Sequence, residues 1–462
     1  MIDPEGIESI HEAALRLLAE VGVVVFDTEA VDLLAANGCT VDGRRVRFQG
    51  SLVDDALNSA PRRYTVAGRR SERDLHIGAG EPVLATASGP PFIIDRDGRR
   101  GGTLADVRDA VALAHLATNV DVYAQPIPAL DVPDEVRPRA HARAAVVGTD
   151  KVCRFDVTTA GELDVACDVA EIIFGAGWHE RPRLVSVINT TSPLQLSADA
   201  SRGLLRLAAL GQPICLTVCA MGGATAPITL AGLLTLQHAE LLAGLILTQL
   251  AHPGCPFLYG ATSSLSSMRN GALMVGVPGY WALTAAAVAL GHSLGLPVRA
   301  GGAITDAHVI DAQAGFESAL GLEAALSANA DFTLHAAGIL SSFNAYSPAK
   351  FVVDDAIAGG LRAAHAPLVI DDETLALDVM AAVGPGGTFL DQRHTRRNLR
   401  ARPELPGESI MSREPYETWQ ALGERDIGER ARQRVDELLA AYEPPGDLDP
   451  VTLRQLEAYC GQ

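Results

Sequence analysis

The chain has 462 residues and a formal net charge of −19, which argues against nucleic acid as a partner. Hydrophobic residues make up 48% and aromatic residues 5%, so a large core can be buried, with helices favoured over a β-sandwich. The length suits one barrel of roughly 250 residues with additions at its ends.

Residues 1–104 predict a mixed α+β addition at the N-terminus. Helical periodicity runs through residues 5–21 and 28–37. Residues 46–48 alternate like a short strand, and residues 82–95 indicate strands interrupted at a Gly-Pro-Pro turn.

Residues 105–360 repeat one pattern, a short apolar run followed by a loop and a helix of roughly 10 to 20 residues. Strands that alternate with helices form parallel βαβ units, and eight of them predict a closed (β/α)8 TIM barrel. The last part, residues 361–462, predicts a mostly helical extension. The eight runs that we expect as barrel strands are 121–125, 151–156, 184–189, 213–219, 256–259, 273–277, 297–299 and 331–335.

Function in such a barrel gathers at the C-terminal ends of the strands. Arg299 ends one run, and its guanidinium either binds a substrate carboxylate or forms a salt bridge with Asp306. His335 ends another, where it donates to a carboxylate, transfers a proton or is a structural histidine. The strand ends also carry Gln125, Asp156, Asn189, Cys219 and Tyr259.

Other polar and aromatic residues have two interpretations each. Asp95 precedes a turn, so it is a turn residue or the neutraliser of a cationic substrate. Aromatic side chains either surround a quaternary ammonium through cation–π contacts or pack in the core. The candidates are Tyr259, Tyr280, Trp281, Phe343 and Tyr346.

Metal-site patterns are weak, and we expect no metal site. Cys215 and Cys219 lie four residues apart on a strand, and His238 and Glu240 form a bare HxE pair. The chain has no CxxC or HExxH motif, and its Gly-rich stretches match neither a Walker nor a Rossmann loop.

The seven cysteines are scattered, which favours reduced thiols and a cytoplasmic protein, and the acidic first residues lack the shape of a signal peptide. Residues 228–251 and 271–298 are long enough to cross a bilayer. The first contains His238 and Glu240, and glycines and prolines interrupt the second. Buried barrel elements explain both stretches, so we expect no membrane association.

Several segments resemble the corrinoid-dependent trimethylamine methyltransferase family, in one order along nearly the whole chain. The N-terminal helices and residues 419–460 are similar too. Their succession is more specific than any single motif. The most characteristic segments are Gly222–Gly232, Ala239–Gly244, Gly295–Gly302, Asp311–Glu317, Gly384–Leu390 and His394-Thr395.

The resemblance implies a barrel that passes a methyl group to the cobalt(I) of a corrinoid carried by a separate protein. Members that act on trimethylamine carry a pyrrolysine, whereas this chain has only standard residues. It therefore resembles the branch that includes glycine betaine–corrinoid methyltransferases. A quaternary amine expels a neutral tertiary amine, so we expect no catalytic acid. A homo-oligomer is also expected.

For a betaine, the resemblance implies that Arg299 and His335 bind the carboxylate. Asp95, Asn189 and aromatic residues (Tyr259, Phe343, Tyr346) would then surround the rest of the substrate. One position departs from the family, because Pro278-Gly279 stands where a Pro-Glu pair is expected. Two other functions fit the same pattern: different chemistry on a betaine-like acid, and a binding protein without catalysis.

Overall fold

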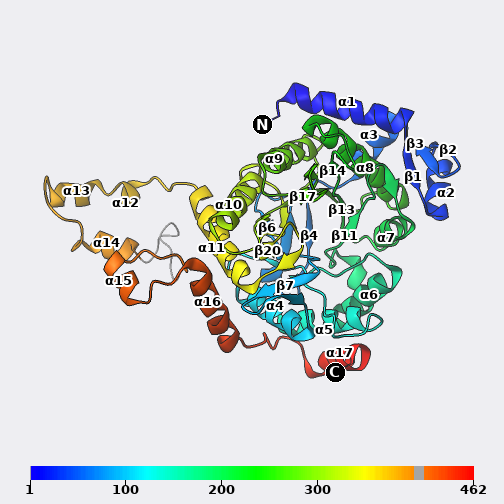
Figure 1. The fold of residues 1–462 in the computed structure, drawn as a ribbon. Coiled ribbons are helices and arrows are strands. Elements are labelled where there is room, and N and C mark those ends of the chain that lie inside the picture. The colour runs from blue at the N-terminus through cyan, green and yellow to red at the C-terminus, as the bar shows by residue number, and fades with distance from the viewer. Residues whose placement is uncertain (1, 400–409, 462) are drawn as a thin grey trace.

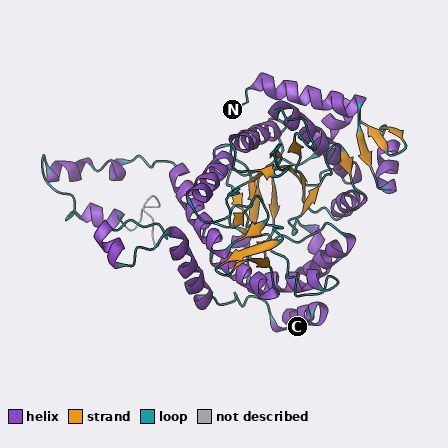
Figure 2. Ribbon diagram, in the orientation of Figure 1, coloured by secondary structure: helices purple, strands orange, loops and turns teal. Residues whose placement is uncertain are grey.

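Eight parallel strands form a closed ring inside a ring of helices, in the computed structural model that describes residues 2–399 and 410–461 (Figures 1 and 2). Continuous pairing joins β11, β13, β15, β18, β19 and β6, and β9 pairs with β10. Single parallel bridges, Ala85 with Val122 and Arg154 with Val185, close the ring. The strands are β6 (Val83–Leu84), β9 (Val122–Tyr123), β10 (Val152–Cys153), β11 (Val187–Asn189), β13 (Ile214–Val218), β15 (Phe257–Ala261), β18 (Val298–Gly301) and β19 (Phe332–Leu334).

One helix follows each barrel strand within the described residues, so the expected (β/α)8 fold is confirmed. Local sequence defines where these helices begin: Thr103 with Asp106 and Thr159 with Glu162 form capping boxes. The helices are α4 (Leu104–Leu116), α5 (Arg137–Gly148), α6 (Ala160–Phe174), α7 (Ala198–Ala209), α8 (Leu230–Ala251), α9 (Pro278–Ser293), α10 (Ala312–Ser327) and α11 (Pro348–His365).

One expected barrel strand is wrong. Leu273–Met274 forms β17, which pairs antiparallel with β16 (Ser264–Ser266) outside the ring. The missing barrel strand is β6, inside the segment that the sequence assigned to the N-terminal addition. Its two paired residues are too few to give a periodic signal. The division into parts at residues 104 and 360 stays a prediction.

The N-terminal part packs on one side of the barrel and beneath it. Helix α1 (Pro4–Glu20) and α3 (Gly50–Ser59) both contact α8. Strand β1 (Val23–Val25) pairs with β12 (Gln195–Leu196), so the addition is joined to the loop after β11. The other elements are α2 (Thr28–Ala36), β2 (Thr40–Asp42), β3 (Arg45–Arg47), β4 (Tyr64–Val66), η1 (Ser71–Arg73) and β5 (Leu75–Ile77).

Short elements decorate the loops, and helices end the chain. The loop elements are β7 (Phe92–Asp95), β8 (Gly98–Gly101), η2 (Trp178–Glu180), β14 (Met221–Gly222), β20 (Ile339–Leu340) and β21 (Ala345–Tyr346). Helices α12 (Asp372–Leu375), α13 (Leu377–Val383), α14 (Arg393–Asn398) and α15 (Tyr416–Ala421) stand away from the barrel as an arm (Figure 1). The chain then returns, with α16 (Ile427–Ala441) on α11 and α17 (Pro450–Cys460) on α5.

Helix α8 is the one described helix long and apolar enough to cross a membrane. In the chain it connects β13 to β15, and it packs on the outside of these strands and against α1, α3 and α7. Most residues of its apolar stretch are buried inside the protein. Its composition is therefore that of a core helix.

Buried neutral histidines make the fold sensitive to acid. Burial lowers the pKa of His238 to about 3 and that of His141 to about 4. Below pH 6.5 these two histidines therefore become protonated in the unfolded state while they stay neutral in the folded state. Stability is full above pH 6.5 and falls as the pH drops toward each folded pKa.

Between pH 6.5 and 5.5, His238 alone is expected to remove about 1 kcal/mol from the free energy of unfolding. The His238→Gln variant should lose that part of the pH dependence, measured by urea denaturation at both pH values. The His252→Gln variant changes an exposed histidine and serves as the control. If the free energy of unfolding of His238→Gln depended on pH as strongly as that of the wild type, His238 would not be the source of the acid sensitivity.

Candidate functional site

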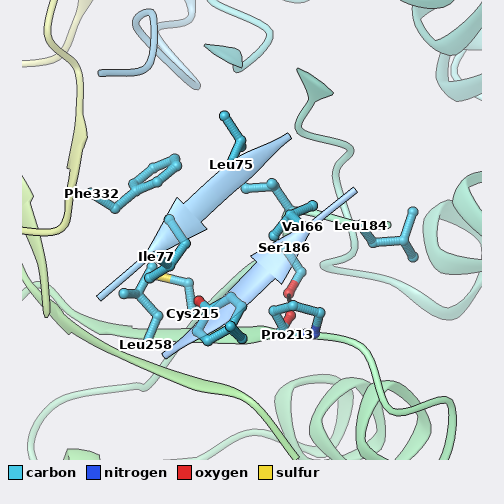
Figure 3. Close-up of a pocket in the computed structure, with 11 residues that line it drawn as sticks. Val66, Leu75, Ile77, Leu184, Ser186, Pro213, Cys215, Leu258 and Phe332 are labelled. Atoms are coloured by element: carbon cyan, nitrogen blue, oxygen red, sulfur yellow. Dashed lines mark hydrogen bonds between the residues drawn. The ribbon is translucent and has the colours of Figure 1, made fainter. Parts of the chain in front are cut away.

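The N-terminal end of the barrel is closed. Hairpin β4–β5 lies across it, and Val66, Leu75 and Ile77 pack against barrel residues such as Cys215 and Phe332 (Figure 3). The cavity left there is apolar and has a volume of about 20 Å³. That space holds about one water molecule, so it is too small for a substrate.

The C-terminal end is open to solvent. Asn189, the last residue of β11, is exposed. Cys219, which follows β13, is exposed as well. Polar side chains on the neighbouring strands lie deeper in the barrel.

Two buried arginines face the barrel interior from opposite sides. Val298 packs in the layer between barrel and helices, so the next residue of β18, Arg299, points inward. Arg154 follows β10 and is positioned by the same alternation after the inward-facing Val152. Strands β10 and β18 are four places apart in the ring of eight, so the two guanidinium groups approach from opposite walls.

Arg299 has almost no polar partner among the residues that the structure describes. Only 1% of the residue is exposed, and Nη1 donates to the Ala261 carbonyl at 3.2 Å. Its Nε has no partner, and no described carboxylate forms an ion pair with it. Asp306 instead accepts from the backbone N–H groups of Val275 and Gly276. The salt bridge to Asp306, one of the two sequence interpretations, is therefore absent from the described structure.

The charges in this interior do not balance. Arg154 pairs with Asp156 at 2.8 Å, but its Nε also lacks a partner. Burial lowers the pKa of Arg299, yet a guanidinium stays protonated in proteins. A buried cation without a counter-ion is costly, so the arrangement favours an anionic ligand.

His335 directly follows β19 and has a defined tautomer. The Ser88 N–H donates to its Nδ1 at 3.2 Å, so in the neutral ring the proton is on Nε2. Burial, together with the charges of Arg299 and Arg154, holds the pKa of His335 well below its usual value. At neutral pH the ring therefore presents one donor, Nε2–H, and no charge.

Phe343 covers His335 from a strained loop. The two rings meet edge to face with centroids 4.9 Å apart. The loop has positive φ at three consecutive residues, Ser341, Ser342 and Phe343. Non-glycine residues rarely adopt this conformation unless surrounding contacts hold it in place. The Asp306 carboxylate holds the loop by accepting from the Ser342 hydroxyl at 2.5 Å.

Glu317 on α10 fixes Asp306 in turn. Its carboxylate accepts from the Thr305 hydroxyl at 2.6 Å and from the Asp306 N–H at 2.8 Å. A Cβ on Gly276 would lie 2.1 Å from the Glu317 side chain, so only glycine fits beside it. These contacts rigidify the loops around the open end of the barrel.

Three predicted site residues are not brought to this group. Tyr259 points outward and its hydroxyl bonds to His238 at 3.0 Å. Tyr346 is buried among residues of α4, α11 and β7, in the core cluster against which Phe343 also packs. Asp95 accepts from the Asp97 N–H at 2.8 Å, as a turn residue does, and forms an ion pair with Arg100 at 2.8 Å.

Arg299, His335 and Phe343 do come together, with Asn189 at the opening. Sequence reasoning missed Arg154, because only Asp156 was considered at the end of that run. The available signal was a charged side chain inside an otherwise apolar strand. Gln125 donates to Asp156, which pairs with Arg154, so both also lie beside this group. The metal-pattern candidates lie elsewhere: His238 bonds to His11 and Tyr259, whereas Glu240 accepts from Thr190, Ser192 and Leu194.

Comparison with known proteins agrees with this architecture. The glycine betaine methyltransferase of Desulfitobacterium hafniense (strain Y51) is 36% identical over 469 residues, covering 100% of this chain and 96% of that protein. The trimethylamine methyltransferase MttB2 of Methanosarcina mazei is 30% identical, covering 96% of this chain and 92% of that protein.

The monomethylamine methyltransferase of Methanosarcina barkeri has a similar fold, with a TM-score of 0.52 at 12% identity, covering 95% of this chain and 88% of that structure. The family model of trimethylamine methyltransferase (MTTB) matches residues 1–462. The chain therefore belongs to the trimethylamine methyltransferase family.

Proposed function

We propose that this protein transfers a methyl group from a quaternary amine that carries a carboxylate, such as glycine betaine, to the cobalt(I) of a corrinoid on a partner protein. Family membership and the similar glycine betaine methyltransferase support methyl transfer. The observation that carries the substrate class is the buried Arg299 guanidinium without a counter-ion. Trimethylamine has no group that would neutralise it.

In the proposed complex the substrate carboxylate replaces the missing counter-ion. Arg299 offers Nε and its terminal nitrogens for two parallel hydrogen bonds, and His335 adds Nε2–H. Because Nδ1 of His335 already accepts from Ser88, the ring is held ready to donate. Phe343 presents an aromatic surface to the ammonium group.

Charge also orients the substrate. Arg299, which has no counter-ion among the described residues, repels the ammonium end, so the N–CH3 bonds point away from the barrel interior and toward the opening beside Asn189 and Cys219. Cobalt(I) supplies the nucleophile, and the leaving tertiary amine is neutral. The protein therefore contributes positioning and exclusion of water, with no acid or base in the methyl transfer.

The direct test is methyl transfer to reduced cobalamin, free or protein-bound, followed by visible absorbance. The panel contains glycine betaine, longer betaines, choline and trimethylamine. Loss of the cobalt(I) spectrum with a betaine, together with its demethylated product, supports the proposal. Turnover of choline or trimethylamine in preference to betaines would overturn the substrate class. Betaine binding without any methyl transfer would indicate a binding protein or different chemistry.

We also propose that the protein is a cytoplasmic homo-oligomer. All seven cysteines are free, as expected in a reducing compartment. The arm exposes large apolar side chains, which monomers rarely leave in contact with water. They are Leu368, Val369, Ile370, Leu375, Leu377, Met380, Phe389, Leu390, Leu399, Tyr416 and Leu422.

These eleven side chains place apolar surface on the order of 1,000 Å² on the arm, comparable with the ~800 Å² per partner of a stable interface. A second copy of this chain, always present at equal concentration, is the partner that we propose. Sedimentation equilibrium should give a mass of at least two chains. The Leu368→Asp/Leu390→Asp double variant should lower that mass, and a monomeric wild type would contradict the proposal.

A further inference from the structure

The Tyr280 hydroxyl is buried without a partner beside Arg299. The residue is 1% exposed, lies near the start of α9, and its oxygen makes no hydrogen bond in the described structure. The Thr284 hydroxyl is close, one turn along the helix, but the geometry is not that of a hydrogen bond. A phenol usually finds a partner when it is buried, and of the three described tyrosines whose buried oxygens lack one, Tyr280 is the one close enough to Arg299 to be influenced by its charge.

Gly301 lets this phenol reach the barrel interior. A Cβ on Gly301 would lie 1.9 Å from the Tyr280 oxygen. Gly301 is two residues after Arg299 on β18, so both positions face the same side of the strand. The hydroxyl thus lies above the Arg299 guanidinium, toward the open end, with Cys219 also close enough to influence the pKa of the phenol.

The phenol has the right charge state for a donor. Burial raises the pKa of Tyr280 far above neutral, while the nearby Arg299 opposes this shift. The hydroxyl therefore keeps its proton at neutral pH. The phenol oxygen is a weak acceptor for the Arg299 N–H groups. Its O–H can instead donate a charge-assisted hydrogen bond to an anion that Arg299 binds.

We propose that Tyr280 donates a hydrogen bond to the substrate carboxylate above Arg299 and thereby selects amines that carry a carboxylate over those that do not. This role rests on the proposed function, because it assumes an anionic substrate group at Arg299. This role also bears on the departure at Gly279, where a family glutamate was expected. Gly279 has no side chain to contact the substrate, and Tyr280, the next residue, supplies the contact instead.

Binding of glycine betaine, choline and tetramethylammonium to the isolated chain tests this role without any acceptor. In Tyr280→Phe we expect betaine affinity to fall roughly 10-fold to 100-fold, as for loss of a hydrogen bond to a charged group. Affinity for tetramethylammonium should stay within a factor of two. Calorimetry measures both. Tyr346→Phe is the matched control, since it removes another buried hydroxyl without a partner, outside the site.

Cys219 provides a second readout that does not need betaine to be the substrate. Alkylation of Cys219 by iodoacetamide, read by peptide mass, should be slowed by acetate in the wild type and not in Tyr280→Phe, with Cys460 as the internal control. If acetate protected Cys219 from alkylation but betaine did not bind, Tyr280 would still be a carboxylate donor and the proposed function would be rejected. Equal betaine affinity in Tyr280→Phe and the wild type would reject this role alone, and no protection by any carboxylate would reject both.

Discussion

Replacing Arg299 with Met is expected to weaken glycine betaine binding by roughly 100-fold or more, because the buried carboxylate then loses its only full counter-charge. Methionine fills most of the space of the arginine stem, so the loss reports charge and hydrogen bonding. Binding of tetramethylammonium, which has no carboxylate, should change little. Isothermal titration with the two ligands measures the difference.

The same substitution should leave the ligand-free protein at least as stable. Arg299 is buried with one hydrogen bond, so its removal takes away an uncompensated charge. A melting temperature equal to or above that of the wild type, together with lost binding, would identify a residue kept for function. A large drop in melting temperature would instead assign Arg299 a structural role. Arg299→Lys should recover part of the affinity, because the charge returns without the planar fork.

The sequence predicted the barrel because the βα rhythm depends on local patterns, but it misplaced one strand. β6 pairs over only two residues, whereas residues 273–277 form a longer apolar run that also precedes a helix. Apolar periodicity measures length and burial. It does not report the pairing partner, which only the closed ring determines.

Position at strand ends nominated Arg299, His335 and Tyr259 alike, but the structure turns the Tyr259 side chain toward His238 in the helix layer. Parallel barrel strands are apolar on both faces, so the sequence does not reveal which residues point inward. Tyr259 and Gly260 differ by one residue and face opposite sides of β15. Tyr280 illustrates the converse, since a helix residue reaches the interior only because Gly301 leaves space for it.

A buried ion pair on α11 supports the His335 loop from behind. Lys350 and Asp354 are both fully buried and paired with each other. Lys350 also donates to the Ser318 hydroxyl at 2.7 Å, and Asp354 accepts from the Gly338 N–H at 2.8 Å. Gly338 is three residues after His335, so this pair ties the loop that leaves β19 to the helix layer.

Replacing Asp354 with Ala is expected to lower the free energy of unfolding by about 3 to 5 kcal/mol, because it leaves the Lys350 ammonium buried without its counter-ion. Chemical denaturation at pH 7.5 measures the loss. The double variant Lys350→Met/Asp354→Leu removes both charges, and it should recover most of the stability.

The double variant separates stability from function. Its Gly338 N–H no longer has the carboxylate acceptor, so the loop carrying His335 is released even though the core is apolar and well filled. We therefore expect near-normal stability with betaine affinity several-fold weaker. If the double variant were as unstable as Asp354→Ala, the damage would come from packing of α11, because no buried charge would be left unpaired. If it bound betaine as the wild type does, His335 would be positioned by its bond to Ser88 alone.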